Sequence, residues 1–447
     1  MFEIYNLLLC TINNININSK QIKMKIFNSS NAKRIIFSFF SLLLMQTICA
    51  IPAPKFTEGN LVVFQTASSA VTSNTSGAFL EISSITANQV SAVNTFNIAK
   101  TTLRFSGSAT STGYLANSND GTLVFVTGGY NSNDDAVNVN TITSRGVGSL
   151  DNAFNFNIAT SYTGTSGQQT RCATSLDNST FFIGDQSGLF TNTTTSASPS
   201  GNIRSVKAFG GVVYAFASST SSVPVSVVSA PTGGALTALP GLGMGVSSHQ
   251  DFYMVSSGSN GSTYDILYIL SATSATAGTI AKYSLVSGSW VANGTYTTNF
   301  GGFGLCATYA SSNTALYITT GTGATSTNKV MKLLDVAGYN TTIDITTANN
   351  ITLFTTLTGT ILKGIAFAPK TADISTTAPQ TTTRLDIYKE GNSLVFNASA
   401  GEVIDVYQLL GKKLIHQTAT EGKNIVPVSE TGFVVVRVGN RTACIEL

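Results

Sequence analysis

The sequence has few charged residues and, beyond its N-terminus, no long hydrophobic run. Charged side chains make up 10% of the 447 residues. No apolar segment after the N-terminal region approaches the roughly 20 residues of a membrane-spanning helix, so we expect no transmembrane segment in the mature chain. The formal net charge is only +3, and the basic residues of the body are scattered rather than clustered. We therefore expect no nucleic-acid partner, since phosphate backbones bind clustered Lys and Arg.

Histidine and cofactor motifs are also scarce. The body of the chain has one histidine, His249 in SSHQDFYM, next to Asp251. A lone histidine in a strand-rich sequence is more typical of a hydrogen-bonded or surface residue than of a catalytic base, and it is too few for a His-based zinc site. The segment GTGATSTNK at 321–329 lacks the spacing of a phosphate-binding loop. We assign no catalytic, cofactor-binding or metal-binding residue and expect no cofactor.

The cysteine pattern does not predict a disulfide framework. Cys10 and Cys49 fall in the N-terminal leader, which leaves Cys172, Cys306 and Cys444, an odd number. Cys172 and Cys306 occupy the same place in the similar phrases RCATSLDNS and LCATYASSN. We predict two packed thiols, because free cysteine is a common small core residue. A disulfide between them, or a reactive role, is the alternative.

The N-terminus has the three-part layout of a secretory signal. A basic segment (MKIFNSSNAKR) begins at Met24 and is followed by the apolar IIFSFFSLLLMQTICA and by small residues near a cut point. We predict a signal peptide at 24–50, with cleavage after Ala50 or Ala53, and interpret residues 1–23 as an over-extended start. A membrane anchor would need a longer apolar run.

The body, residues 54–370, reads as a series of short strands. Runs such as GNLVVFQ, GTLVFVTGG, YDILYIL and ALYITTG alternate with Gly, Asn, Ser and Asp clusters, and no segment has helical periodicity. This pattern predicts an all-β fold.

A weak internal repeat indicates the kind of all-β fold. Four segments, beginning at Gly113, Arg171, Ile203 and Leu305, each pair a small-residue strand with a bulky apolar strand across an Asx or Gly turn. Such hairpins suit propeller blades, whose innermost strands are crowded. FTEGNLVVFQ and LKGIAFAPK would close the ring by sharing a blade, and GIAFAP resembles the closing strand of bacterial YVTN and kelch-like propellers. We predict a seven-bladed β-propeller, with a β-sandwich or β-helix as alternatives.

Acidic residues are the remaining candidates for chemistry, because glycosidases need only two carboxylates. Asp120 and Asp177 fall in the turns of the repeat, so the turns account for them. Asp134 and Asp135, in NSNDDAVNVN, are a weak candidate for calcium that reads first as a polar loop. The aromatics Trp290 and Tyr296 are candidates for sugar stacking, yet such residues pack blades at least as often. The acids of the body are Glu58, Glu81, Asp120, Asp134, Asp135, Asp151, Asp177, Asp185, Asp251, Asp265, Asp335 and Asp344.

The composition changes near residue 380. The Thr-rich segment 371–383 reads as a linker, and 384–447 carries 14 charges in 64 residues, about twice the average of the chain. Its strands are RLDIYKEG, NSLVFNA, GEVIDVYQLLGKKLIHQ with a Gly-centred hairpin, KNIVPV, FVVVRVGN and RTACIEL. These strands predict a small antiparallel β-sandwich, which we call the C-terminal module.

The C-terminal module resembles the sorting domain of the type IX secretion system of Bacteroidota. The resemblance rests on VIDVYQLLGKKLIHQ and NIVPVSETGFVVVRVGNRTACIEL, although Cys444 and Glu446 depart from the apolar and basic residues common in that family. It implies recognition by the type IX translocon, removal by a surface sortase, and a secreted or outer-membrane location. The residues that carry the resemblance are Gly411, Lys412, Pro427, Val428, Gly432, Phe433, Val436 and Arg441.

The sequence predicts the location of the protein more specifically than the function of its body. A secreted or cell-surface propeller that binds protein or glycan through loops at one end of the blades is the leading hypothesis. A polysaccharide hydrolase or lyase with paired carboxylates is the competing one. The sequence leaves open whether the chain is an enzyme, and favours a binding role.

Overall fold

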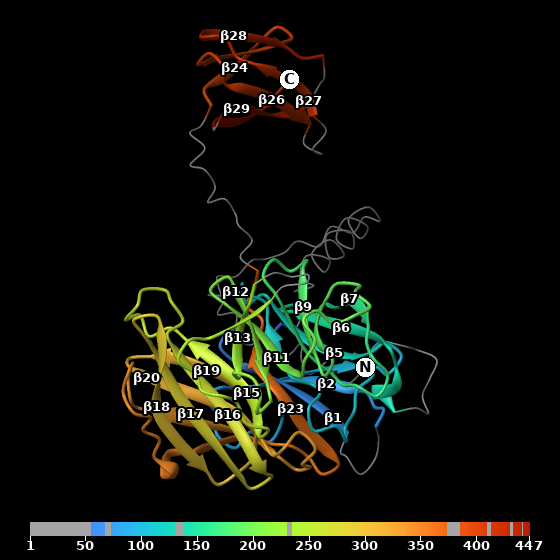
Figure 1. The fold of residues 1–447 in the computed structure, drawn as a ribbon. Coiled ribbons are helices and arrows are strands. Elements are labelled where there is room, and N and C mark those ends of the chain that lie inside the picture. The colour runs from blue at the N-terminus through green and yellow to red at the C-terminus, as the bar shows by residue number, and fades with distance from the viewer. Residues whose placement is uncertain are drawn as a thin grey trace, which may run out of the picture. The chain divides into compact units, whose positions relative to one another are not determined.

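A computed structural model describes residues 55–67, 73–130, 138–229, 235–372, 385–408, 413–429, 432–439 and 441–447 (Figure 1). The predicted start, signal peptide and both cleavage points lie outside these residues, as does most of the linker. The described chain is all-β, with two single-turn 3-10 segments, η1 (Val139–Thr141) and η2 (Thr347–Asn349). No helix in these residues has the length and apolar character needed to cross a bilayer.

The described part of the body forms six antiparallel sheets in which consecutive strands pair. The first three sheets contain β23 (Thr360–Phe367), β1 (Leu61–Ala67), β2 (Gly77–Ile82) and β3 (Asn94–Ile98); β4 (Ala116–Asn117), β5 (Leu123–Gly129), β6 (Ser144–Asp151) and β7 (Phe156–Thr163); and β8 (Thr170–Ser175), β9 (Phe181–Asp185) and β10 (Gly188–Thr191). The other three contain β11 (Ile203–Phe209), β12 (Val212–Ala217), β13 (Val225–Val228) and β14 (Leu236–Ala238); β15 (His249–Val255), β16 (Ile266–Ser274), β17 (Ala277–Val286) and β18 (Ser289–Thr298); and β19 (Gly302–Ala310), β20 (Asn313–Thr320), β21 (Lys329–Asp335) and β22 (Ile351–Thr355).

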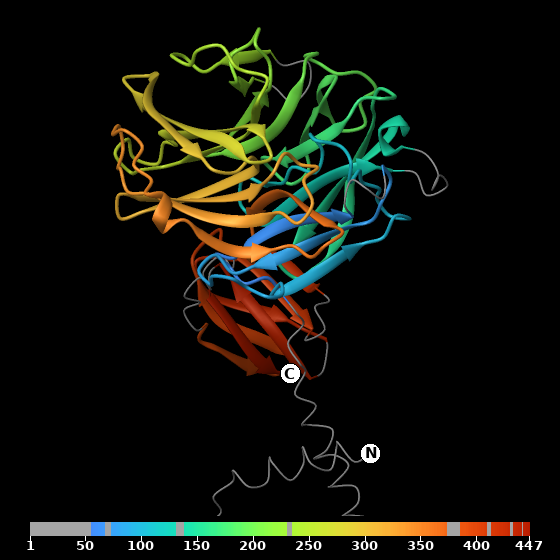
Figure 2. The same ribbon diagram turned by 90° about the horizontal axis from the view of Figure 1, so that it is seen from below.

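The two ends of the body meet in the first sheet. β23 pairs antiparallel with β1, with Leu61 opposite Phe367 and Val62 opposite Ala366. In Figures 1 and 2 the dark orange β23 accordingly lies beside the blue β1. The predicted sharing of one sheet by FTEGNLVVFQ and LKGIAFAPK is confirmed, and the pairing satisfies an edge that either strand alone would expose.

The edge strands β23, β4, β8, β11, β15 and β19 lie next to one another at the centre of the body. Each contacts the next in this order, and β19 also contacts β23. A Cβ at Gly364 of β23 would lie 2.3 Å from the backbone nitrogen of Leu115, and one at Gly304 of β19 would lie 2.9 Å from that of Ile365. A Cβ at either position would collide with the neighbouring backbone, so only glycine fits there. The close approach of β23 and β19 to their neighbours therefore depends on these two glycines.

The repeat seen in the sequence corresponds to the first two strands of a sheet. The four repeat segments are β4–β5, β8–β9, β11–β12 and β19–β20, as predicted. The number of seven blades is wrong, because the described body contains six sheets. The irregular spacing of the repeat, caused by long connections such as that between β15 and β16, made the units uncountable from sequence.

The hydrophobic cores lie between consecutive sheets. Phe64 and Phe79 of the first sheet pack with Val124 and Leu150 of the second. Equivalent clusters join the second sheet to the third, the third to the fourth, the fourth to the fifth, the fifth to the sixth, and the sixth back to the first. Each sheet therefore buries both faces, which accounts for strands that are apolar almost throughout, such as β16.

The C-terminal module has two antiparallel sheets over a core of its own. One sheet contains β24 (Ile387–Glu390), β25 (Ser393–Ala398) and β28 (Gly422–Pro427), and the other β26 (Val403–Gln408), β27 (Lys413–Thr418), β29 (Phe433–Val438) and β30 (Arg441–Glu446). Phe396 from the first sheet and Ile404 and Val436 from the second share the core. This is the sandwich arrangement that the strand pattern predicts, and β26 and β27 pair antiparallel.

Candidate functional site

The residues that carry the sorting resemblance occupy different environments in the module. Gly411 and Lys412 lie outside the described residues. Pro427 ends β28 and is exposed, whereas Val428 is buried and packs in the module core. Val436 is fully buried in that core. Val428 and Val436 therefore have a packing role whatever their role in sorting.

The other three residues lie at the ends of the last two strands. Gly432 precedes β29 with φ +96°, a conformation that favours glycine. Phe433 follows it and is 52% exposed. Arg441 begins β30, where its Nη2 lies 2.7 Å from Glu402 Oε2 and its Nη1 donates to the backbone oxygen of Asn397. Arg441 therefore ties the last strand to the rest of the module.

A pocket of about 360 Å³, which we call the strand-end pocket, lies near the central strands of the body. It gathers residues from the C-terminal portions of β4, β11, β15, β19 and β23. These residues are Asn117, Phe209, Tyr253, Thr308 and Phe367, and loops add Glu58, Tyr264 and Lys370. Five of the six sheets thus contribute to one opening.

Aromatic rings form one wall of the strand-end pocket. The ring of Phe209 meets that of Tyr253 edge-on, with centroids 5.0 Å apart, and lies 5.2 Å from that of Tyr264. Tyr253 in turn lies 6.2 Å from Phe367. Because each ring rests on another, the wall keeps its shape without a ligand. Sequence reasoning missed these residues, although aromatics near the ends of IRSVKAF, HQDFYMV and KGIAF were a usable signal.

The polar groups of the strand-end pocket differ in their availability. The Asn117 amide is occupied, since it donates to Phe367 O over 2.9 Å and accepts from Phe367 N. The hydroxyls of Tyr253, Tyr264 and Thr308 make no hydrogen bond to another described residue. Burial raises the pKa of Tyr253 well above its usual range, so this hydroxyl stays protonated and can donate. Three hydroxyls that line the pocket therefore have no hydrogen-bond partner among the described residues.

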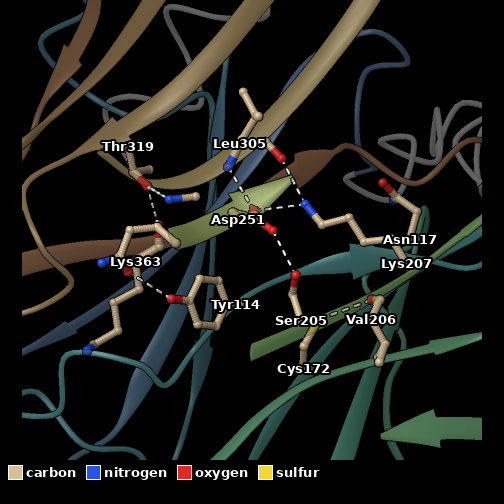
Figure 3. Close-up of polar contacts among 12 residues, drawn as sticks. Tyr114, Asn117, Cys172, Ser205, Val206, Lys207, Asp251, Leu305, Thr319 and Lys363 are labelled. Atoms are coloured by element: carbon tan, nitrogen blue, oxygen red, sulfur yellow. Dashed lines mark hydrogen bonds and ion pairs between the residues drawn. The ribbon is translucent and has the colours of Figure 1, made fainter. Parts of the chain in front are cut away.

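A buried ion pair lies below the strand-end pocket (Figure 3). Lys207 lines a smaller cavity of about 20 Å³ that shares Asn117, Phe209 and Tyr253 with the pocket. Its Nζ lies 2.8 Å from Asp251 Oδ2 and also donates to Leu305 O. The pair joins β11 to β15 at the centre of the body.

Asp251 is held by more than its lysine. Its Oδ1 accepts from Ser205 Oγ over 2.9 Å, and its Oδ2 accepts from Leu305 N over 2.9 Å. Burial raises the pKa of Asp251, while the Lys207 charge opposes that shift. With every nearby donor engaged, the carboxylate is a structural group rather than a free base.

His249 does not pair with Asp251, its near neighbour in sequence. Its Nδ1 lies 2.8 Å from Ser271 Oγ, which confirms a hydrogen-bonded histidine. Burial, with the charge of Arg204, lowers its pKa to about 4, so the ring is neutral near pH 7.

The described acids of the body are dispersed rather than paired. Asp120 and Asp177 accept backbone amides within their own turns, as predicted. Asp185 and Asp335 pair with the buried Arg145 and Lys282. The others with structural partners are Glu81, Asp151 and Asp265, which accept hydrogen bonds from neighbouring loops and strands. Among the described residues that line the strand-end pocket, Glu58 is the one carboxylate.

The remaining candidates from the sequence divide as follows. Cys172 and Cys306 are buried free thiols, as predicted. Trp290 is only 4% exposed and packs in the core between the fourth and fifth sheets, which is the packing alternative given for it and not sugar stacking. The hydroxyl of Tyr296 lies 2.7 Å from that of Thr347. Asp134 and Asp135 lie outside the described residues, within which no cluster of three metal-ligating side chains occurs.

No protein-family model and no curated protein sequence matches the chain. The solved structures that are similar to the chain include two whose similarity is at a low level. One is a candidate 6-phosphogluconolactonase from Bacteroides uniformis ATCC 8492, 10% identical with a TM-score of 0.39, which covers 86% of this chain and 99% of that one. The other, a candidate 6-phosphogluconolactonase from Bacteroides fragilis NCTC 9343, is 10% identical with a TM-score of 0.39 and covers 82% and 98%. Similarity this low assigns no function to the chain.

Proposed function

We propose that residues 54–370 form a six-bladed β-propeller that binds carbohydrate in the strand-end pocket at the cell surface. The observation that carries the proposal is the aromatic wall of that pocket beside three hydroxyls with no described partner. The propeller is supported by the pairing of β23 with β1 and by the contacts that run from β23 through β4, β8, β11, β15 and β19 back to β23.

Carbohydrate fits the chemistry of the pocket. A sugar ring has an apolar face of C–H groups that packs on aromatic rings and a rim of hydroxyls that both donate and accept. The partly exposed Tyr253, Tyr264 and Phe367 offer the rings, while Tyr264 and Thr308 offer hydroxyls. The volume of about 360 Å³ lies in the usual range of ligand pockets, roughly 300–1,000 Å³.

The competing function is a hydrolase or lyase that uses paired carboxylates. Such enzymes place two acids roughly 5–9.5 Å apart around the scissile bond. The described lining of the strand-end pocket has Glu58 alone. A binding role needs no second carboxylate, and we favour it for that reason.

Binding can be tested with the exported chain, residues 54–447, on a glycan array followed by calorimetry. Tyr253→Phe removes one pocket hydroxyl and is expected to weaken binding about threefold to tenfold, as a hydrogen bond contributes about 0.5–1.5 kcal/mol. Tyr264→Ala removes a ring as well and is expected to cost more. The matched control is Tyr283→Phe, whose hydroxyl does not line the pocket.

Three outcomes count against carbohydrate binding in this pocket. They are no retained glycan on the array, equal affinity of the pocket variants and wild type, and retention of a protein ligand alone. Release of new reducing ends from a bound glycan, lost in Glu58→Gln, would establish the enzyme instead.

We propose further that the C-terminal module directs the chain through the type IX secretion system to a secreted or outer-membrane location, with the translocon and sortase as partners. The order of the resembling elements and the predicted signal peptide support this. Deleting 384–447 in a producing bacterium is expected to abolish surface delivery, and Tyr388→Ala, an exposed change in the module, serves as the control. Undiminished surface delivery of the deletion variant would refute the proposal.

A further inference from the structure

A second groove lies between the last strands of the first two sheets. It has a volume of about 520 Å³ and runs between β3 and the start of β7. We call it the outer groove and define it by Phe96, Asn97, Phe154, Asn155, Phe156 and Asn157. It shares no lining residue with the strand-end pocket.

Three phenylalanine rings form the floor of the outer groove. Phe96 and Phe154 are parallel within 2°, with centroids 6.4 Å apart. Phe156 lies 5.6 Å from Phe96. All three side chains are partly exposed, unlike the fully buried Phe252 and Phe303 of the central strands. The Phe156 ring is tilted by 31° from that of Phe96, so the floor offers a ligand two parallel rings and a third inclined to them.

The rings are fixed in place by buried partners. Phe154 packs against the buried Phe56, with centroids 4.4 Å apart, and Phe156 lies 6.4 Å from the buried Phe79. A Cβ at Gly148 of β6 would lie 2.4 Å from the ring of Phe156. The glycine therefore leaves the space that the ring occupies. A floor supported in this way is preorganised, which reduces the entropy lost on binding.

The turn that carries Phe154 has an unusual backbone. Phe154 has φ +62°, a left-handed conformation that is an outlier for a bulky residue. Asp151 holds the turn, because its Oδ1 accepts from the backbone nitrogens of Ala153 and Asn155, each over 2.9 Å. Strained residues of this kind concentrate at binding sites, where neighbouring bonds maintain them.

The polar groups of the outer groove are neutral. No charged side chain occurs among its described lining residues. The exposed side chains of Asn97 and Asn157 make no hydrogen bond to another described residue, and each amide has both a donor and an acceptor. Flat apolar rings beside free amides match the two faces of an uncharged sugar.

We propose that the outer groove is a second carbohydrate-binding site, specific for an uncharged polysaccharide whose rings lie on Phe96, Phe154 and Phe156. An extended peptide added to the edge of β7 is the rival occupant. Part of that edge is already used, because Ser161 O accepts from Thr193 N and Thr163 N donates to Thr194 O. The side-chain amides, in contrast, remain open, and they favour the sugar.

The test is native affinity electrophoresis of residues 54–447 in gels containing hydroxyethyl cellulose, soluble starch, dextran or laminarin, with alginate as a charged comparison. We expect retardation by at least one neutral polymer and none by alginate. Phe96→Ala and Asn157→Ala should each weaken the apparent affinity for that polymer about threefold to tenfold, since truncating a central contact commonly has effects of this size. Tyr388→Ala, which removes an exposed aromatic side chain of the module, should leave the retardation unchanged.

A second variant keeps the test interpretable if a groove variant is unstable. Gly148→Ala replaces no residue of the groove but displaces the Phe156 ring, and it should also reduce retardation. Trp290 fluorescence, which reports on the body, checks that each variant is folded.

The outcomes separate this proposal from the strand-end pocket. Suppose that Tyr264→Ala is no longer retarded, whereas the folded variants Phe96→Ala, Asn157→Ala and Gly148→Ala are retarded as wild type. This result would refute the outer groove as a sugar site and would support binding in the strand-end pocket. The reverse pattern would support the groove alone. Absence of retardation by every neutral polymer, or capture of a displayed peptide by wild type but not Phe96→Ala, would overturn the groove as a sugar site.

Discussion

Replacing Lys207 with methionine should destabilise the body strongly, because it leaves a carboxylate buried without its cation. The side chains of Lys207 and Asp251 are 4% and 1% exposed, so neither can turn to solvent. Methionine has a similar length and fills the space beside Phe252 and Tyr253, over whose rings the ammonium lies at 5.8 and 5.3 Å. The substitution therefore removes a charge more than it creates a cavity.

The magnitude follows from the environment of the pair. Removing one partner of a buried ion pair costs about 3–5 kcal/mol, mostly through desolvation of the remaining charge. Asp251 keeps its bonds from Ser205 and Leu305, which places the expected loss toward the lower end of that range. The double variant Lys207→Met/Asp251→Asn removes both charges and should recover at least about 1–2 kcal/mol of the loss.

The loss should depend on pH, with a definite sign. Burial raises the pKa of Asp251 above its ordinary value even beside Lys207, and removing the ammonium raises it further. A carboxyl whose folded pKa is raised binds more protons when folded, so stability falls as pH rises from the unfolded pKa, about 4, to the folded one. The penalty in Lys207→Met is therefore largest at neutral pH and shrinks as the solution is acidified.

The assay is urea unfolding followed by the fluorescence of Trp290. It is the one tryptophan of the chain, it is 4% exposed, and it shares a core with Phe252, so it reports on the body rather than the module. The reasoning is refuted if Lys207→Met unfolds within about 1 kcal/mol of wild type at pH 7. It is also refuted if the double variant is less stable than the single one.

Three further predictions concern other buried groups. Burial raises the pKa of Cys172 to about 12 and also raises the pKa of Cys306. Neither thiol should therefore react with a maleimide at pH 8 until urea unfolds the body. Peptide mass mapping of the labelled protein checks this. Burial lowers the pKa of Lys363 to about 7, so unfolding free energy should rise between pH 7 and about 10.5, and Lys363→Met should remove that rise in urea titrations at several pH values. Gly364→Ala should lower the unfolding free energy by about 1–3 kcal/mol or more in the same assay, because the added Cβ meets the backbone of Leu115.

Local pattern was sufficient to predict much of the fold. Alternation and Asx turns predicted the hairpins at β4–β5, β8–β9, β11–β12 and β19–β20, since both signals lie within about 20 residues of sequence. The pairing of β1 with β23 was also predicted, because each segment reads as a lone strand at an end of the body. The number of sheets was not predicted. The hairpin of β15 and β16 does not resemble the repeat, because the two strands are joined by a long polar loop and begin with bulky residues.

The candidate sites were much less accessible to prediction. The strand-end pocket takes one or two residues from each of five strands between Asn117 and Phe367, and only the three-dimensional arrangement brings them together. The outer groove shows the same limit, since Phe96 and Phe156 come from different sheets. A sequence pattern describes which face of a strand is apolar, and says little about which distant strand that face meets.

The buried ion pairs give these distant contacts a physical basis. Arg145 on β6 pairs with Asp185 on β9, Lys207 on β11 with Asp251 on β15, and Lys282 on β17 with Asp335 on β21. Every pair joins two consecutive sheets, in a chain with only 10% charged residues. Buried pairs add little net stability relative to apolar packing, but a mismatched neighbour would leave a charge buried alone. We infer that they select the order of the sheets. Fully apolar replacement of one pair should then preserve stability while slowing or diverting refolding, a result that separates selection of order from stabilisation.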